Sequence, residues 1–443
     1  MLKVSNNRRF LVHADGMPFF YLGDTAWELF HRLTLDDAER YLADRAAKRF
    51  TVIQAVVLAE IDGLHVPNMN GDTPLVDDDP TRPNEAYFQH VDAVVDRAAA
   101  LGLHLGMLPT WGDKWNQKWG VGPEVFTPEN ARAFGDYVGR RYADRPIIWI
   151  VGGDRPIENE TQRLIVRGLA AGLRAGDGGN HLITMHTWGP HSTSEYVQEE
   201  PWLDFHTCQS GHARNSATWR FIAADYARTP TRPCMDAEPG YEDMPEDLRN
   251  LDGGYLDDWD ARKALYWALF AGAHGHTYGC NPVWQMWRPG RPPLINPRRP
   301  WYEALNLPGS SQMQHARALL LSRPFLRRIP DQSLIVSDVG EGTHHVQATR
   351  DCDGRYALIY LPAGDPVELD LSKLAGDELA GYWFDPRTGA ARAIGVVPNH
   401  GRRSFTPPPG GLDWVLVLDD AAGGFPPPGS ISGIDQGDSD AEL

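Results

Sequence analysis

The sequence predicts a (β/α)8 barrel followed by a small antiparallel β-sandwich. Two observations predict the barrel: between about residues 18 and 278, short apolar runs alternate with polar turns and amphipathic helical patterns, and eight such runs occur. Eight strands with crossover helices over about 260 residues match this fold in number and size. A change after Phe325 predicts the sandwich, because short runs, several of them alternating, are separated there by turn residues.

The predicted barrel strands are short and mostly apolar. They are Phe19–Leu22, Val52–Leu58, His104–Leu108, Ile147–Val151, Leu182–His186, Leu203–Thr207, Pro233–Asp236 and His274–Tyr278. Helices are predicted over Leu35–Lys48, Glu85–Leu101, Pro128–Tyr142, Thr161–Ala175 and Asp258–Ala271. A doubly wound parallel sheet is the alternative, but it does not explain why polar residues follow the strands around the whole cycle.

The domain boundaries follow from the same change of pattern. The barrel domain is predicted over residues 1–322 and closes with a helix at Ser310–Ser322, and the β-sandwich is predicted over residues 323–420. Its strand candidates are Ser333–Val336, His344–Ala348, Tyr356–Leu361, Val367–Leu371, Leu379–Phe384, Ala391–Val396 and Leu412–Leu418. We expect residues 421–443 to be disordered, since they are Gly, Pro, Ser and Asp with little to bury.

Composition excludes several classes of function. The net charge of −17 opposes nucleic-acid binding, and no apolar stretch approaches the length of a membrane span. The N-terminus lacks the apolar core of a signal peptide, so we expect a cytoplasmic protein, or a secreted or periplasmic one if a signal has been removed. The four cysteines form no CxxC pair and are interpreted as free thiols. No cofactor or metal is expected, because Asp77–Asp79 lacks the Gly and Glu of a calcium-binding loop.

Two acids at the ends of predicted strands indicate the chemistry. Asp154 follows Ile147–Val151 after two glycines, and Glu238 follows Pro233–Asp236. The C-terminal strand ends of a (β/α)8 barrel carry its active site, and its fourth and seventh strands lie on opposite sides. Retaining glycosidases need a protonated acid and a carboxylate nucleophile about 5–5.5 Å apart. We therefore predict Asp154 as acid/base and Glu238 as nucleophile.

Each assignment has an alternative. Asp154 is also placed to cap a helix or to pair with Arg155, and Glu238 is also placed for a salt bridge within its loop. Asp236 is a rival nucleophile, but alternation along the strand puts it on the same side as Glu238 and farther from the open end.

Polar and aromatic residues at the other strand ends are predicted to bind the sugar. They are Asp24, Trp27, Gln54, Trp111, Lys114, His186, Trp188, His206, Gln209, His276 and Tyr278. Indole rings beside polar groups suit sugars, which have apolar faces and polar edges. The alternative is that the Trp residues pack in the core and the polar residues satisfy backbone groups at strand ends. The loops at Trp111–Trp119 and Val283–Pro308 are long enough to wall off one end of the pocket.

Three motifs resemble glycoside hydrolase family 140. They are Gly23-Asp24-Thr25-Ala26-Trp27, Val151-Gly152-Gly153-Asp154-Arg155-Pro156 and Asp236-Ala237-Glu238-Pro239-Gly240-Tyr241-Glu242. The resemblance implies an apiosidase-like barrel whose catalytic pair maps to Asp154 and Glu238. Residues 381–389 resemble the signature of the β-sandwich that follows this barrel, which was once described as collagen-binding.

The expected function is removal of a terminal sugar from a short glycan or glycoside. A β-linked apiosyl unit is implied by the resemblance alone. The alternatives are a glycosidase of the same fold acting on another pentoside or hexoside, and a non-catalytic carbohydrate- or matrix-binding protein. The expected partner is an oligosaccharide or glycoside. Collagen binding is not expected, because it has no obvious use in a chain without a secretion signal.

Overall fold

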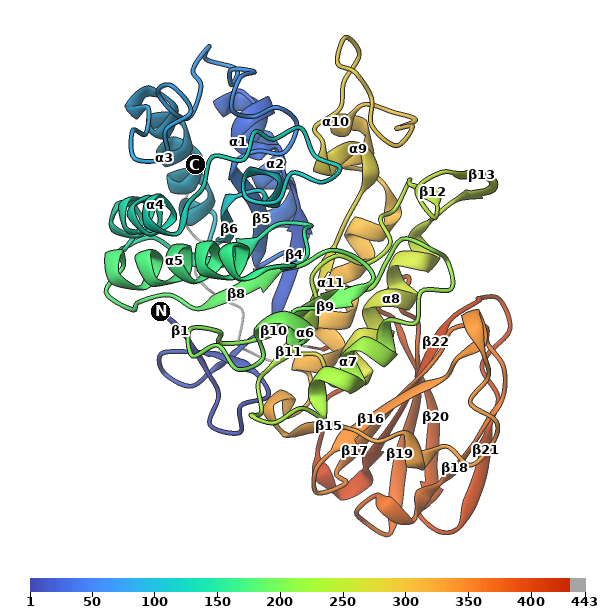
Figure 1. Ribbon diagram of the computed structural model, residues 1–443. Helices are drawn as coiled ribbons and strands as arrows, with labels where there is room; N and C mark the ends of the chain where they lie inside the picture. The colour runs from blue at the N-terminus through green and yellow to red at the C-terminus, as the bar shows by residue number, and fades with distance from the viewer. Residues whose placement is uncertain (431–443) are drawn as a thin grey trace, which may run out of the picture. The chain divides into compact units, whose positions relative to one another are not determined.

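The computed structural model describes residues 1–430, which form two compact units (Figure 1). The first unit comprises Met1–Ala261 and Ala273–Ser310, and the second comprises Arg262–Gly272 and the chain from Ser311 onward. Residues 262–272 and 311–322, which the sequence prediction assigns to the barrel, are thus grouped with the second unit. Residues 431–443 of the predicted disordered tail lie outside the described residues.

The first unit contains the predicted barrel. Its parallel strands are β4 (Tyr21–Thr25), β5 (Val52–Leu58), β6 (His104–Thr110), β7 (Ile147–Gly152), β8 (Ile183–His186), β10 (His206–Gln209), β11 (Cys234–Asp236) and β14 (Gly275–Tyr278). They are joined in the order β8-β7-β6-β5-β4-β14-β11-β10, and β9 (His191–Ser192) adds an antiparallel edge to β10. The series closes where the Asp204 amide donates to the Ile183 carbonyl oxygen at 2.9 Å. The (β/α)8 fold class is confirmed.

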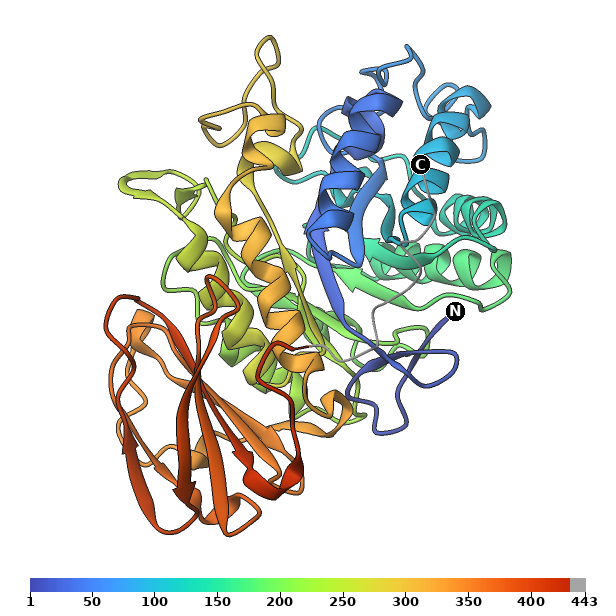
Figure 2. The ribbon, with the colours of Figure 1, turned by 180° about the vertical axis from the view of Figure 1, so that it is seen from behind.

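Helices of the first unit pack against these strands (Figure 2). They include α2 (Leu35–Ala47), α3 (Glu85–Ala100), α4 (Pro128–Arg141), α5 (Glu160–Gly176) and α7 (Thr218–Tyr226), and α8 spans Asp258–Phe270. Local sequence signals fix several helix starts: Thr34 caps α2 through the Asp37 amide, and Thr127 and Asn130 form a capping box at α4. Helix α7 has no counterpart among the predicted helices.

Helices α4 and α5, which flank β7 in the chain, pack against each other through glycines. A Cβ atom at Gly139 would lie 2.7 Å from the carbonyl oxygen of Leu173, and one at Gly176 would lie 2.8 Å from the amide nitrogen of Arg140. These positions have room only for hydrogen, so the two backbones are in direct contact. At these positions the two helices therefore pack backbone against backbone, with no side chain between them.

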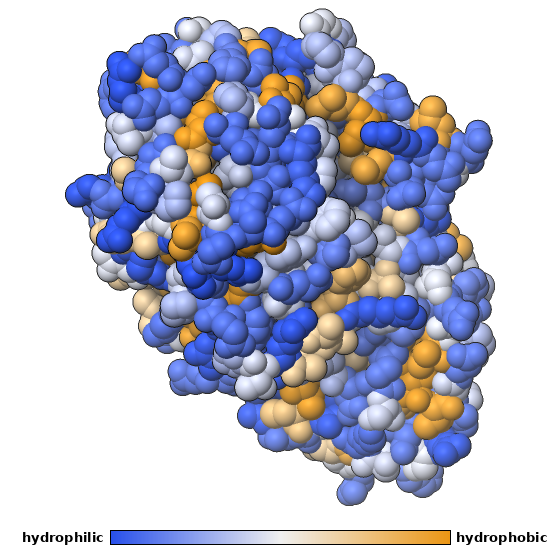
Figure 3. Space-filling model, in the orientation of Figure 1, coloured by the Kyte–Doolittle hydropathy of each residue, from blue (hydrophilic) through white to orange (hydrophobic). Residues whose placement is uncertain are grey.

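Short elements complete the first unit. They are β1 (Leu2–Val4), β2 (Leu11–His13), β3 (Pro18–Phe19), α1 (Leu29–Arg32), α6 (Ser194–Val197), β12 (Pro245–Glu246), β13 (Asn250–Tyr255), α9 (Asn281–Trp284) and α10 (Trp301–Ala304). Within residues 1–430, no helix combines the length and the apolar character needed to cross a membrane. The face of the molecule in Figure 3 is mostly hydrophilic, with apolar residues in small separate groups.

The second unit contains antiparallel sheets, as predicted. Its strands are β15 (Arg328–Pro330), β16 (Gln347–Asp351), β17 (Tyr356–Leu361), β18 (Val367–Asp370), β19 (Glu378–Phe384), β20 (Ala391–Pro398), β21 (Arg402–Phe405) and β22 (Trp414–Asp420), and helix α11 spans Pro308–Leu321. Six strands form one sheet in the order β15-β16-β17-β22-β19-β20, and β18 pairs with β21. Trp383 and Phe384 are buried, as expected.

One predicted strand of this unit is not formed as expected. The segment Ser333–Val336 begins in a 3-10 turn over Gln332–Leu334, because the Asp331 side chain accepts a hydrogen bond from the Ser333 amide and caps that turn. Strands β15 and β21 were not predicted. Cys208, Cys234 and Cys280 are buried and Cys352 is exposed, and no disulfide is present among the described residues.

Candidate active site

The turn after β7 places Asp154 at the open end of the barrel. Gly152, Gly153 and Asp154 have φ angles of 92°, 124° and 49°, so three successive residues adopt backbone conformations that L side chains rarely take. A Cβ atom at Gly153 would lie 2.8 Å from the amide nitrogen of Gly112, and one at Gly152 would clash with the carbonyl oxygen of His186. The paired glycines therefore allow the sharp turn that carries the acid into the cavity.

Asp154 is held in a setting that favours its protonated form. Burial and the nearby negative charge of Glu238 raise the pKa of the Asp154 carboxyl to about 6. Trp119 Nε1 and an Arg155 guanidinium nitrogen each donate to Asp154 Oδ2 at 3.1 Å, which partly opposes this rise. The ion pair with Arg155, considered as an alternative role, is thus present together with the placement of Asp154 in the cavity.

Glu238 follows β11, and its surroundings favour the ionised form of its carboxyl, in contrast to those of Asp154. Burial alone would raise its pKa, but hydrogen bonds from His186 and His212 lower the pKa of Glu238 to about 2. His186 Nε2 lies 2.8 Å from Glu238 Oε2, while Gln209 Nε2 donates to Oε1 at 3.1 Å and His212 Nε2 lies 3.3 Å from the same oxygen. This carboxyl is therefore an anion over most of the pH range.

Asp236, the rival nucleophile, supports Glu238 from below. It is fully buried, and its Oδ1 accepts a hydrogen bond from the Glu238 backbone amide at 3.2 Å. Burial raises the pKa of Asp236 to about 6. Glu238 lines the cavity and Asp236 does not, so Asp236 positions the backbone of Glu238.

The two carboxyls share a cavity of about 600 Å³ at the C-terminal ends of the strands. Aromatic side chains make up much of its wall: Trp27, Trp111, Trp119, Trp188, Phe221, Tyr241 and Trp284. Both long loops expected to form walls contribute, the first through Trp119 and the second through Trp284 and Ile295. Of the predicted sugar-binding residues, those that line the cavity are Trp27, Trp111, Trp188 and Gln209.

Three other predicted residues lie outside the cavity, contrary to expectation. Asp24 is fully buried and accepts hydrogen bonds at 2.5 Å from both Tyr41 Oη and Arg45 Nε. Gln54 Nε2 donates to Thr277 Oγ1 at 2.6 Å, and buried Lys114 pairs with Asp113 at 2.8 Å. Asp24 and Gln54 lie within strands β4 and β5, so their side chains are enclosed by the barrel wall and do not reach its rim.

The predicted group of His206, His276 and Tyr278 near the carboxylates is also corrected. His206 Nδ1 lies 3.3 Å from Thr193 Oγ1, and the Tyr278 hydroxyl donates to Glu242. Burial lowers the pKa of both His206 and His276 to about 3, so each is neutral. All three residues belong to strands β10 and β14 and are enclosed in the same way. His186, at the end of β8, differs because its side chain reaches Glu238.

The cavity is also lined by residues outside the predicted set, among them Glu60, Trp119, His212 and Tyr241. All four follow strands in the sequence, which is the same signal that selected the others. They lie two or more residues beyond a strand end, where side chains clear the wall of the barrel. Distance beyond the strand end is the feature that separates them from Asp24 and Gln54.

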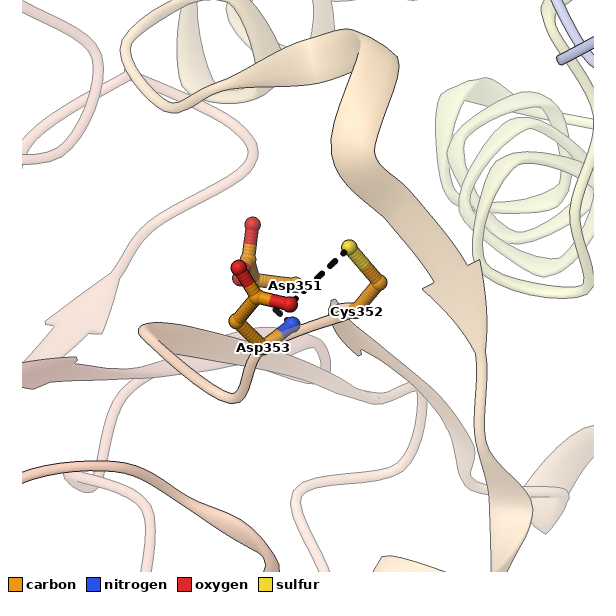
Figure 4. A group of neighbouring side chains, drawn as sticks. All are labelled: Asp351, Cys352 and Asp353. Carbon is orange, nitrogen blue, oxygen red and sulfur yellow. Dashed lines mark hydrogen bonds between the residues drawn. The ribbon is translucent and has the colours of Figure 1, made fainter.

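A separate cluster in the second unit joins Asp351, Cys352 and Asp353 (Figure 4). Among the described residues, it is the group whose possible metal-ligand atoms lie within 4.8 Å of one another. The cluster forms the turn between β16 and β17, where Asp351 Oδ1 accepts from the Asp353 amide at 2.8 Å. Arg327 pairs with both carboxylates, so the negative charge of this turn is already neutralised by a cation of the protein.

A family model described as "Apiosidase-like, catalytic domain" matches residues 5–327. The chain belongs to the apiosidase-like family. This agrees with the resemblance seen in its motifs. A second family model, for a collagen-binding-type domain of a collagenase, matches residues 329–419 of the apiosidase-like chain. No curated protein matches it.

Two solved structures are similar to this apiosidase-like protein over nearly its whole length. One, named "Glycoside hydrolase", is 34% identical with a TM-score of 0.88, and the similarity covers 95% of this chain and 97% of that one. The other, a family 5 glycoside hydrolase from Bacteroides vulgatus, is 33% identical with a TM-score of 0.87, and covers 95% and 94%. The apiosidase-like chain is therefore a glycoside hydrolase.

Proposed function

We propose that the protein is a retaining glycosidase that removes a terminal sugar, with Asp154 as acid/base and Glu238 as nucleophile. The observation that carries this proposal is the opposite shift of two carboxyl pKa values in one cavity: Asp154 is raised to about 6 and Glu238 is lowered to about 2. Between these values one carboxyl holds a proton and the other is an anion. Pairs whose environments separate their pKa values in this way divide the roles of acid and nucleophile.

The first step transfers the proton of Asp154 to the glycosidic oxygen while a Glu238 oxygen attacks the anomeric carbon. The bond between that carbon and the leaving oxygen breaks, which gives a glycosyl ester on Glu238 and a free alcohol. Esterification removes the negative charge of Glu238. Because that charge helps to raise the pKa of Asp154, its loss lowers this pKa and prepares Asp154 to act as a base.

In the second step Asp154 takes a proton from water, whose oxygen attacks the anomeric carbon. The ester bond breaks, Glu238 leaves as a carboxylate, and the sugar is released with its original anomeric configuration. The hydrogen bonds from His186, Gln209 and His212 stabilise the departing carboxylate. Asp154 again holds a proton at the end of the cycle.

The geometry also supports an orientation for the substrate. The leaving group must lie on the side of Asp154, and there the Trp119 and Trp188 rings lie with their centroids 5.9 Å apart. Trp119 is 55% exposed and both rings line the cavity, so they suit a sugar or aryl leaving group. The glycone is placed beside Glu238, where His186 contacts both that carboxylate and the rings of Trp27 and Trp111, whose centroids are 5.2 Å apart.

A β-linked apiosyl unit is the proposed glycone, on the support of the family. Another pentoside or hexoside fits the same two-carboxylate chemistry, whereas a non-catalytic binding role leaves the opposed pKa values of Asp154 and Glu238 without a use. A panel of 4-nitrophenyl glycosides that includes the β-D-apioside tests the proposal, with NMR to follow the anomer first released. Turnover with retention is expected. Release of the inverted anomer, or no turnover of any member, contradicts it.

A further inference from the structure

A further carboxyl, that of Glu60, lines the cavity with Asp154 and Glu238. It follows β5, between Trp27 after β4 and Trp111 after β6. Around the barrel, β5 is separated from β11 by β4 and β14 on one side and by four strands on the other. Glu60 and Glu238 therefore enter the cavity from facing parts of the wall, and a glycone held there lies between them.

The Glu60 carboxyl differs from the other two in its partners. Glu238 has three protein donors and Asp154 has two, whereas within residues 1–430 no hydrogen bond or ion pair to the Glu60 carboxyl is present. Nearby cations are engaged elsewhere: Arg155 binds Asp154 and the Asn116 carbonyl oxygen. Glu60 therefore retains its full hydrogen-bonding capacity for a ligand in the cavity.

The charges around Glu60 determine its protonation. Burial, followed by the negative charges of Glu28, Asp154, Asp113 and Glu238, holds the pKa of Glu60 well above its usual range. His31 and Arg32 lower the pKa of Glu28, and Lys114 pairs with Asp113 at 2.8 Å, so these three cations are engaged with other acids. A carboxyl that no cation contacts, placed beside other carboxyls in a cavity, favours its protonated form, and that form can donate a hydrogen bond.

We propose that Glu60 is a specificity-determining residue of this site, whose neutral carboxyl donates a hydrogen bond to a hydroxyl of the glycone held between Glu238 and the Trp27–Trp111 wall. The inference rests on the proposed glycosidase function and extends it. It implies a glycone with a free hydroxyl directed away from Glu238. A site built to bind a hydroxyl rejects analogues that lack it, because a buried polar group is then left unpaired.

Two substitutions with different hydrogen-bonding capacity test the role. Glu60→Gln keeps a neutral donor of nearly the same shape, and Glu60→Ala removes it. With the 4-nitrophenyl glycoside that the wild type hydrolyses fastest, we expect kcat/KM to fall less than about threefold in E60Q and more than about thirtyfold in E60A, mainly through KM. Equal losses in both variants, or no loss in E60A, overturn the inference. Glu199→Gln and Glu199→Ala, at an exposed position, are the matched controls.

A second measurement reports on Glu60 without any turnover. The infrared difference spectrum of wild type minus E60Q at pH 7 should contain the C=O stretch of a protonated carboxyl and no carboxylate band. A carboxylate band in its place overturns the inference, whatever the activity. If this protonated band is present but no glycoside is hydrolysed, the proposed function fails while the neutral state of Glu60 is supported. If glycosides are hydrolysed and E60Q loses as much as E60A, the glycosidase proposal stands and the inference fails.

Discussion

His186 Nε2 lies 2.8 Å from Glu238 Oε2, and the backbone amide of Asp154 donates to the other ring nitrogen of His186 at 3.3 Å. Since Nδ1 accepts, the proton of a neutral imidazole is on Nε2 and is donated to the carboxylate. One histidine thus links the backbone of the proposed acid to the side chain of the proposed nucleophile. Both carboxyls are positioned by the same ring.

Removing either of the two proposed catalytic carboxyls should abolish most of the activity without unfolding the protein. Asp154→Asn and Glu238→Gln are expected to lower kcat by about a thousandfold or more, because each removes a group that acts only in the transition state. Asp144→Asn, at an exposed position, is the control and should retain wild-type kcat. Azide should rescue Glu238→Ala by forming a glycosyl azide of inverted configuration. A variant that keeps more than about a tenth of wild-type kcat does not carry its assigned role.

The activity should depend on pH through Asp154. Its pKa is raised to about 6, and the acid must be protonated, so kcat/KM should fall as pH rises above about 6. Glu238 must be ionised, and its pKa of about 2 places the acidic limb below the range in which most proteins stay folded. A profile that rises with pH between about 5 and 8 would contradict the assignment of Asp154 as the acid.

Trp119→Phe should move that basic limb. The indole N–H donates to Asp154 Oδ2 and stabilises the ionised form, so its removal raises the pKa of Asp154. The midpoint of the kcat/KM profile is therefore expected at a higher pH than in the wild type. Trp188→Phe is the control: its Nε1 donates to Tyr196 Oη and not to a carboxyl, so the midpoint should stay in place. A shift to lower pH in Trp119→Phe would contradict the assigned hydrogen bond.

Gly153→Ala should lower kcat/KM more than a Gly→Ala substitution at a position where the added methyl group meets no other atom. Gly153 has a φ of 124° and no room for a Cβ atom beside the Gly112 amide, so the turn that carries Asp154 must shift. We expect kcat/KM to fall by about a hundredfold or more, since small displacements of catalytic groups are costly. Gly178→Ala also has positive φ, but nothing lies within 4 Å of its added atom. It should lower the melting temperature slightly and leave kcat/KM unchanged.

The second unit should not bind collagen, although its family model carries that description. Trp383 is only 6% exposed and Phe384 is fully buried, so these aromatic residues of its signature serve the core of the sheet and present little surface to a ligand. We expect no binding of the full-length protein to immobilised triple-helical collagen at micromolar concentrations. Saturable binding in that range, absent with a heat-denatured collagen control, would contradict this expectation.

The fold was accessible from the sequence because barrel strands are continuous apolar runs. Each of the eight predicted runs overlaps a barrel strand, and β5 has the predicted bounds. The exact strand ends depend on tertiary pairing and were harder to predict. The first strand was expected to end at Leu22, but β4 continues to Thr25, and this places Asp24 inside the wall.

The site was predictable only in part, for the same reason. Asp154 and Glu238 each lie two residues beyond the end of their strand. A small error in the predicted strand boundary therefore does not change their predicted placement in the cavity. The role of Asp24 depends on Arg45, 21 residues later and on another element, and no local pattern shows that contact. Glu60 likewise gains its properties from acids that other strands bring to the cavity.

The glycine contacts between α4 and α5 also affect how far Asp154 can move. Backbones that touch directly have no side-chain rotamers to rearrange, so the two helices on either side of β7 behave as one stiff support beneath Asp154. One of the two hydrogen-bond donors to the same carboxyl is the half-exposed ring of Trp119, which lies in a segment without regular structure, and the other is Arg155. We therefore expect adjustment to leaving groups of different size on the Trp119 side, while the position of Asp154, the proposed proton donor, changes little.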